Sequence, residues 1–79
     1  MPDMAATEAR LPPMRITANG RSFEVKPGTT LGAFIRSRGL DPLYVLVERN
    51  GRPEERARYE QIALVEGDRL ELVRAVAGG

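Results

Sequence analysis

The chain has 79 residues, which is enough for one small domain, and its 42% hydrophobic and 29% charged residues are ordinary for a soluble globular protein. It contains no Cys and no His, which excludes a disulfide, a thiolate or imidazole catalyst, and the ligands that zinc and iron–sulfur sites usually need. Its net charge of +1 gives no broad reason to expect nucleic acid or a membrane as a partner, and its apolar runs are too short to span a bilayer. We therefore expect a cytoplasmic domain without a metal site.

The first stretch, MPDMAATEARLPP, has no sustained period and lacks the apolar segment that a secretory signal needs. We expect residues 1–13 to be a disordered leader. Met14 begins the first patterned stretch and is an alternative start of the natural protein.

From Met14 onward, apolar residues alternate with polar ones, which predicts a half-buried strand. Asn19-Gly20 is typical of a type I′ hairpin turn, and beyond it Phe23 and Val25 alternate with polar residues in a second strand. The sequence therefore predicts a β-hairpin that ends before Pro27-Gly28.

A short helix is predicted near residues 30–38. Thr29 or Thr30 can cap its start, and three apolar residues spaced at i, i+3 and i+4 form a face that we assign to the core: Leu31, Phe34 and Ile35. Gly39 suits a left-handed cap at the end of this helix, and Pro42 prevents its continuation.

The second half of the chain is predicted to form a strand, an irregular link and a final strand. The run LYVLVERNG, residues 43–51, is rich in β-branched and aromatic residues and ends in a second Asn-Gly. Residues 52–66 mix charges with isolated apolar residues, so we expect only a short edge strand and a turn of helix there. Gly67-Asp68 then makes a turn, and Leu70 and Leu72 alternate with other residues in the last strand.

The predicted order of elements is that of the ubiquitin-like β-grasp fold. The chain also carries four marks in sequence: PGTTL at 27–31, VLVERNG at 45–51, VEGDRLELV at 65–73 and RAVAGG at 74–79. With these marks, residues 14–79 resemble the sulfur carrier family of thiamin thiazole biosynthesis, the ThiS-like β-grasp proteins that end in Gly-Gly. The resemblance implies an α+β domain over residues 14–74, in which a mixed sheet of four to five strands packs one main helix on one face. A flexible Gly-Gly tail over residues 75–79 would follow.

The sequence departs from this family in one place. After Asn50-Gly51 the family usually has an apolar strand that leads to a Pro-Arg pair, whereas residues 52–56 here read RPEER. The register of the fourth strand is therefore left open, while the last strand and the tail keep the family pattern.

The resemblance implies a chemistry that is carried by the main chain. An adenylating enzyme that resembles ubiquitin activators would use ATP and magnesium to activate the carboxylate of Gly79. A persulfide from a sulfur donor such as a cysteine desulfurase would displace AMP and leave a thiocarboxylate, and a thiazole synthase would accept the sulfur. The carrier would then be a co-substrate without catalytic side chains or a permanently bound cofactor, which agrees with its lack of Cys and His.

The tail residues have a steric role in this interpretation. Gly78 and Gly79 lack a Cβ, which would let the backbone pass through a narrow channel in a partner. Three residues with small or apolar side chains precede them and suit the same threading: Ala75, Val76 and Ala77. Arg74 is predicted to hold the base of the tail by pairing with a carboxylate of the partner.

Docking to a partner would use apolar residues that the core leaves over. If Val45, Val47, Leu70 and Leu72 face the helix, the alternation leaves three apolar side chains for the open face of the sheet: Tyr44, Leu46 and Val73. An exposed patch of this kind would attract a partner, and with Arg74 it completes the predicted docking set. The alternative is that residues 52–66 or a second copy of the chain cover this face.

Three classes of function remain open from the sequence. The first is the sulfur carrier for thiazole formation. The second shares its chemistry and is either a sulfur carrier for molybdopterin, cysteine or tRNA thiolation, or a ubiquitin-like tag that is conjugated to lysines. The third is a β-grasp interaction module whose tail is inert.

Overall fold

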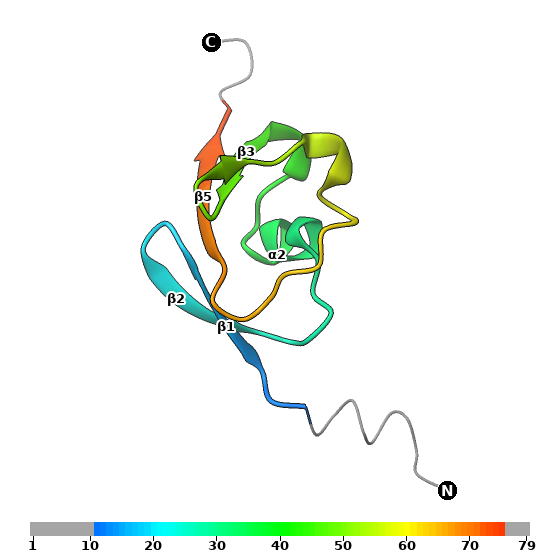
Figure 1. Cartoon of the computed structure of the whole chain (residues 1–79). Helices are drawn as coiled ribbons and strands as arrows, with labels where there is room; N and C mark the ends of the chain where they lie inside the picture. The colour runs from blue at the N-terminus through cyan, green and yellow to red at the C-terminus, as the bar shows by residue number, and fades with distance from the viewer. Residues whose placement is uncertain (1–10, 76–79) are drawn as a thin grey trace, which may run out of the picture.

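The computed structural model describes residues 11–75. Its elements in chain order are β1 (Met14–Ala18), β2 (Arg21–Val25), α2 (Leu31–Ser37), η1 (Pro42–Tyr44), β3 (Val45–Arg49), β4 (Arg52–Pro53), η2 (Arg56–Arg58) and β5 (Arg69–Arg74). The strands form one sheet in the order β2-β1-β5-β3-β4, in which β1 and β5 are parallel and the other neighbours are antiparallel. Helix α2 covers one face of this sheet (Figure 1). The predicted α+β β-grasp architecture is confirmed.

Both Asn-Gly turns have the geometry that their sequence predicts. Asn19 and Gly20 have φ angles of 51° and 80°, and Asn50 and Gly51 have φ angles of 55° and 84°. Positive φ at both central residues is the signature of the type I′ turn, which joins β1 to β2 and β3 to β4 here.

Helix α2 begins and ends close to the predicted limits. Thr30 is the residue that caps it, because its Oγ1 accepts a hydrogen bond from Ala33 N at 3.1 Å. The hydroxyl of Thr29 instead donates to Lys26 O at 2.6 Å. Gly39 follows the helix with a φ of 76°, the left-handed conformation that a glycine adopts without a steric penalty.

The core lies between α2 and the sheet. The three helix residues assigned to it, Leu31, Phe34 and Ile35, are at most 2% exposed. They pack with buried residues of the strands and of the link before β5: Ile16, Ala18, Val45, Val47, Tyr59, Ile62, Leu64 and Leu70. Leu72 is partly buried against the same cluster, so the predicted inward set of β3 and β5 is confirmed.

The link between β3 and β5 contains the expected short edge strand, β4, and a turn of helix, η2. Beyond η2 it crosses the start of α2 and supplies acceptors for donors that a helix start leaves without partners. Leu31 N donates to Ile62 O at 2.8 Å, and Gly32 N donates to Tyr59 O at 2.9 Å. The irregular link therefore fixes the position of the helix.

One predicted boundary is wrong. The strand expected over residues 43–51 begins only at Val45, because Leu43 and Tyr44 belong to the 3-10 turn η1. The cause is local, since the carboxylate of Asp41 accepts a hydrogen bond from Leu43 N at 2.9 Å and Pro42 occupies the first position of the turn. Alternation along a strand therefore does not apply to Tyr44.

Candidate functional site: the end of the last strand

The last strand lies in the middle of the sheet, between β1 and β3, and leads to the end of the molecule opposite the start of β1 (Figure 1). Ala75, which directly follows β5, is half-buried and donates its backbone N–H to Tyr44 O at 2.7 Å. The tail predicted to begin at residue 75 is therefore held at its first residue. The other predicted tail residues lie outside the described residues, and their roles stay predictions: Val76, Ala77, Gly78 and Gly79.

Two asparagines hold β5 from opposite sides. Asn19 binds Leu72 twice, because its Oδ1 accepts from Leu72 N at 2.8 Å and its Nδ2 donates to Leu72 O at 3.1 Å. Asn50 binds Arg69 in a similar way, since its Oδ1 accepts from Arg69 N and its own backbone N donates to Arg69 O, each at 2.8 Å. Sequence reasoning assigned these asparagines to turns alone and missed their bonds to β5.

A buried carboxylate fixes the start of β5. Asp68 is 2% exposed and accepts hydrogen bonds from Asn50 Nδ2 and Val65 N, each at 2.9 Å. Arg49 Nη1 lies 3.5 Å from Asp68 Oδ2, and Arg49 Nε lies 2.6 Å from Glu54 Oε2. The hydrogen bond to Glu54 is the main cause that raises the pKa of Arg49 above its usual value. Side-chain bonds thus hold the start of β5.

The open face of the sheet carries two of the predicted docking residues. Leu46 and Val73 are direct partners in the β3–β5 register and are 52% and 58% exposed. They line a shallow depression of about 380 Å³ together with five other residues, three of them acidic: Val47, Glu48, Pro53, Glu54 and Glu71. Residues 52–66 do not cover Leu46 and Val73, which stay more than half exposed, so that alternative is wrong. Only Pro53 and Glu54 of this link border the depression, whereas its Tyr59, Ile62 and Leu64 pack into the core on the side of the helix.

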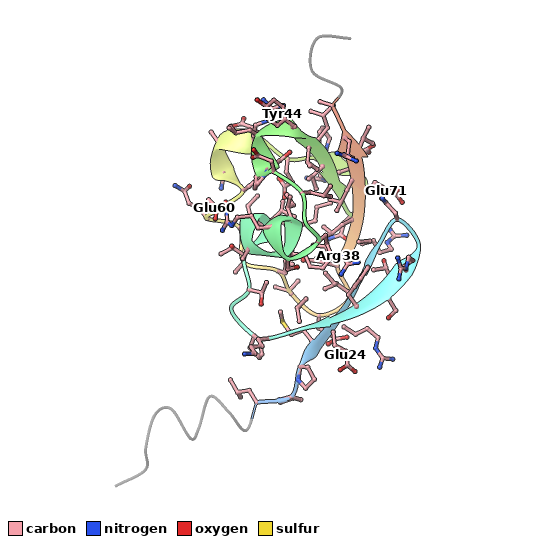
Figure 2. The ribbon with its side chains drawn as sticks, turned by 180° about the vertical axis from the view of Figure 1, so that it is seen from behind. Glu24, Arg38, Tyr44, Glu60 and Glu71 are labelled. Carbon is pink, nitrogen blue, oxygen red and sulfur yellow. The ribbon has the colours of Figure 1, made fainter. Side chains whose placement is uncertain are left out.

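The other two predicted docking residues belong to a different surface. Arg74 pairs with the buried Val45 in the register, so it lies on the helix side of the sheet. Arg74 and Tyr44 line a groove of about 610 Å³ at the base of the tail, whose other lining residues are Gly39, Leu40, Asp41, Val45 and Ala75. Tyr44 lies at the end of the molecule where β5 leaves the sheet (Figure 2). The prediction that Tyr44 joins Leu46 and Val73 on the open face is wrong, because Tyr44 belongs to the 3-10 turn η1 and not to the strand.

Within the part of the chain that the structure describes, no three His, Cys, Asp or Glu side chains gather closely enough to hold a metal ion. Across residues 11–75, no helix is long and apolar enough to cross a membrane.

Comparison with known proteins finds similar chains of the same fold. The model of the ThiS family matches residues 12–79. The crystal structure of the thiamine biosynthesis protein ThiS from Geobacter metallireducens is 27% identical, covers 84% of this chain and 100% of that chain, and superposes with a TM-score of 0.67. A computationally designed protein based on human erythrocytic ubiquitin, solved by NMR, is 18% identical over 87% of this chain and 98% of its own, with a TM-score of 0.51, and shows the fold alone.

A curated relative is a longer protein. A thiazole synthase of Paramagnetospirillum magneticum is 33% identical over 66 residues, which make up 84% of this chain and 20% of that protein. The chain therefore spans about a fifth of the length of the curated relative that it matches.

Proposed function

The chain belongs to the ThiS family, and from this membership we propose that it is a sulfur carrier of thiamin biosynthesis whose C-terminal carboxylate, on Gly79, receives the sulfur. The family match and the ThiS structure support the role of sulfur carrier. The likeness to a thiazole synthase supports a thiazole synthase as the enzyme that accepts the sulfur. A cytoplasmic location, an adenylating enzyme and a sulfur donor such as a cysteine desulfurase complete the proposal.

The reaction needs activation from a partner, because a carboxylate at neutral pH is ionised and a poor electrophile. An oxygen of the Gly79 carboxylate attacks the α-phosphate of ATP, which forms an acyl adenylate and releases pyrophosphate. The persulfide sulfur of the donor then attacks the acyl carbon, and AMP leaves. A thiol cleaves the resulting sulfur–sulfur bond and is oxidised to a disulfide, while the thiocarboxylate stays on Gly79. The partner uses ATP and magnesium, and the carrier contributes only its main chain.

One observation of the structure carries this proposal: β5 ends in a fixed position, three residues before the Gly-Gly sequence. Asn19 and Asn50 bind the strand from its two sides, and the hydrogen bond from Ala75 N to Tyr44 O fixes the residue that follows it. The four residues beyond Ala75, fully extended, could reach about 13 to 14 Å from this point. Such a reach would bring the Gly79 carboxylate into a buried active site while the folded domain stays outside.

The two surfaces beside β5 fit the need for more than one partner. The Leu46–Val73 pair lies on the open face, and the groove with Tyr44 and Arg74 surrounds the base of the tail. We assign both surfaces to docking, with Arg74 as the residue that pairs with a partner carboxylate.

The test is the intact mass of the protein after incubation with ATP, magnesium, a sulfide source and the adenylating enzyme encoded by the same genome. We expect a gain equal to the replacement of one oxygen by sulfur, and tandem mass spectrometry should place it on Gly79. Addition of the thiazole synthase with its other substrates should return the original mass.

Two controls make the result specific. A chain that lacks Gly79 should gain no mass, whereas Glu55→Gln, an exposed change in the link, should be modified like the wild type. If the wild type gains no mass under conditions in which the same enzyme charges another ThiS protein, the carrier proposal is wrong and the interaction module replaces it.

A further inference from the structure

The last strand extends beyond the strand that pairs with it on one side. In the β1–β5 register, Ala18 at the end of β1 lies beside Leu70, whereas β5 continues to Arg74. Figure 1 shows the turn between β1 and β2 stopping short of the end of β5. Asn19, the first residue of that turn, still reaches Leu72 with two hydrogen bonds of its side chain. Within residues 11–75, no bond from the β1 side reaches β5 beyond Leu72.

The odd-numbered residues of β5 turn their backbone groups toward β3. In an antiparallel pair, successive residues alternate between positions that exchange hydrogen bonds with the partner strand and positions that do not. Arg69 O accepts a hydrogen bond from Asn50 N, and Ala75 N donates to Tyr44 O. The two residues are six positions apart, so the odd-numbered residues between them also bond to β3.

The even-numbered residues of β5 therefore turn their backbone groups toward β1. Leu70 O accepts from Asn19 N at 2.9 Å, and both backbone groups of Leu72 bind the Asn19 side chain. Arg74 is the next residue of this series, and within residues 11–75 no group on the β1 side bonds to its N–H or C=O. Unpaired backbone groups of this kind form an open sheet edge, to which an extended peptide can add as a new strand.

We propose that this open edge at Arg74 binds an extended backbone segment of the adenylating enzyme, which adds a short strand beside the end of β5. The segment donates a hydrogen bond to Arg74 O and accepts one from Arg74 N, and so holds the base of the tail extended toward the active site. This inference rests on the proposed function, because it describes how the enzyme that must bring Gly79 to ATP holds the carrier.

Charge favours such a segment over a second copy of this chain. In a symmetric antiparallel pair of β5 strands centred on Arg74, the two Arg74 side chains would lie directly opposite each other, and like charges in that position destabilise a sheet. The turn at Asn19 also limits how far a second β5 could pair. An enzyme segment avoids both limits, because it can place an acidic residue opposite Arg74, which supplies the carboxylate that pairs with the guanidinium.

Amide hydrogen exchange, read at single residues by NMR after a timed exposure to D₂O, tests the open edge directly. In the free carrier, the Arg74 amide should exchange at least about tenfold faster than the amides of Leu72 and Val73, which are bonded on either side of β5. With excess adenylating enzyme, exchange at Arg74 should slow by about tenfold or more. The amide of Glu55, an exposed residue of the link, is the control and should keep its rate.

A pair of substitutions separates the backbone N–H from the side chain. Arg74→Ala and Arg74→Pro both lose the guanidinium, but only proline loses the N–H. Because an edge position whose N–H makes no bond in the sheet tolerates proline, the two variants should have similar urea midpoints. Val73→Pro should have a much lower midpoint, since the N–H of Val73 bonds to β3. We expect KM of the adenylating enzyme to be about tenfold higher for Arg74→Pro than for Arg74→Ala, because a carbonyl of the enzyme is left unpaired.

Each outcome decides the inference. Slower exchange at Arg74 in the complex, together with the higher KM of the proline variant, supports it. If exchange at Arg74 is unchanged in the complex, or if the two variants have equal KM, while the wild type gains sulfur, this inference is wrong and the proposed function stands. Slower exchange at high carrier concentration without the enzyme would identify a second copy as the occupant and also contradict the inference. If the enzyme does not charge the wild type, the proposed function is wrong and the inference with it.

Discussion

At the scale of single residues, Asn19 combines two roles that the Asn-Gly motif alone does not reveal. Its backbone adopts a φ of 51°, and its side chain forms two hydrogen bonds with Leu72 of β5. An amide suits both roles, because asparagine tolerates the left-handed region better than most residues and offers one donor and one acceptor. The turn between β1 and β2 is therefore also a support for the strand that bears the tail.

Substitution of Asn19 can separate the two roles. Asn19→Gly keeps the positive φ and loses the hydrogen bonds to Leu72, so we expect it to lower the free energy of unfolding by about 1 kcal/mol. Asn19→Ala loses the same bonds and keeps a Cβ in the left-handed region without the polar side chain that makes this region accessible to asparagine, so it should be about 1 kcal/mol less stable than Asn19→Gly. Urea unfolding of the two variants measures both terms. Equal stability of the glycine variant and the wild type would contradict the role of the side chain.

At the scale of elements, the link between β3 and β5 supplies hydrogen-bond donors to β3 that a longer edge strand would otherwise supply. Strand β4 pairs only with Glu48 and Arg49 of β3. Next to the rest of β3, Val47 O accepts from Glu54 N at 2.9 Å, and Val45 O accepts from the Tyr59 hydroxyl at 2.8 Å. A side chain and a loop amide thus satisfy carbonyl groups that a full strand would otherwise bind.

The Tyr59 hydroxyl can be tested by its removal. Tyr59 is 1% exposed, and its bond to Val45 O is buried, so Tyr59→Phe should lower the free energy of unfolding at neutral pH by about 1 kcal/mol. Tyr44→Phe is the matched control, because Tyr44 is 50% exposed and should tolerate the same change with little effect. Urea midpoints of the two variants make the comparison, and equal midpoints would show that the buried bond contributes nothing.

Elements whose determinants are local could be predicted from the sequence. The two Asn-Gly turns, the helix with its Thr cap and the alternation in β3 and β5 each depend on neighbouring residues, and the structure has all of them. Tyr44 was misplaced because the Asp41–Pro42 turn interrupts the strand pattern. The bonds of Asn19 and Tyr59 join residues far apart in the chain, so they depend on tertiary register and have no local signal.

At the scale of the whole molecule, the response of stability to pH follows from the few groups that titrate. The chain has no His and no Cys, so no side chain has an ordinary pKa between about 5 and 8. On the acid side, the hydrogen bond from Arg36 lowers the pKa of Glu60 below 4.5. The stability that this ion pair contributes is therefore present above pH 4.5, and it is lost as the pH falls through the lowered pKa of Glu60. Both side chains are 53% exposed, so this loss should be small.

On the alkaline side, burial raises the pKa of Tyr59 above its ordinary value of 10.0. Above pH 10 the unfolded chain loses this phenolic proton before the folded chain does, so the folded state binds more protons and stability decreases as pH increases. The contribution is complete below the unfolded pKa and disappears as pH rises through the folded one. We expect urea midpoints that are nearly constant between about pH 6 and 9 and that fall above about pH 10. Tyr59→Phe should start from a lower midpoint and show a smaller alkaline fall, whereas Tyr44→Phe should fall like the wild type. An equal alkaline fall in Tyr59→Phe would mean that another group is responsible.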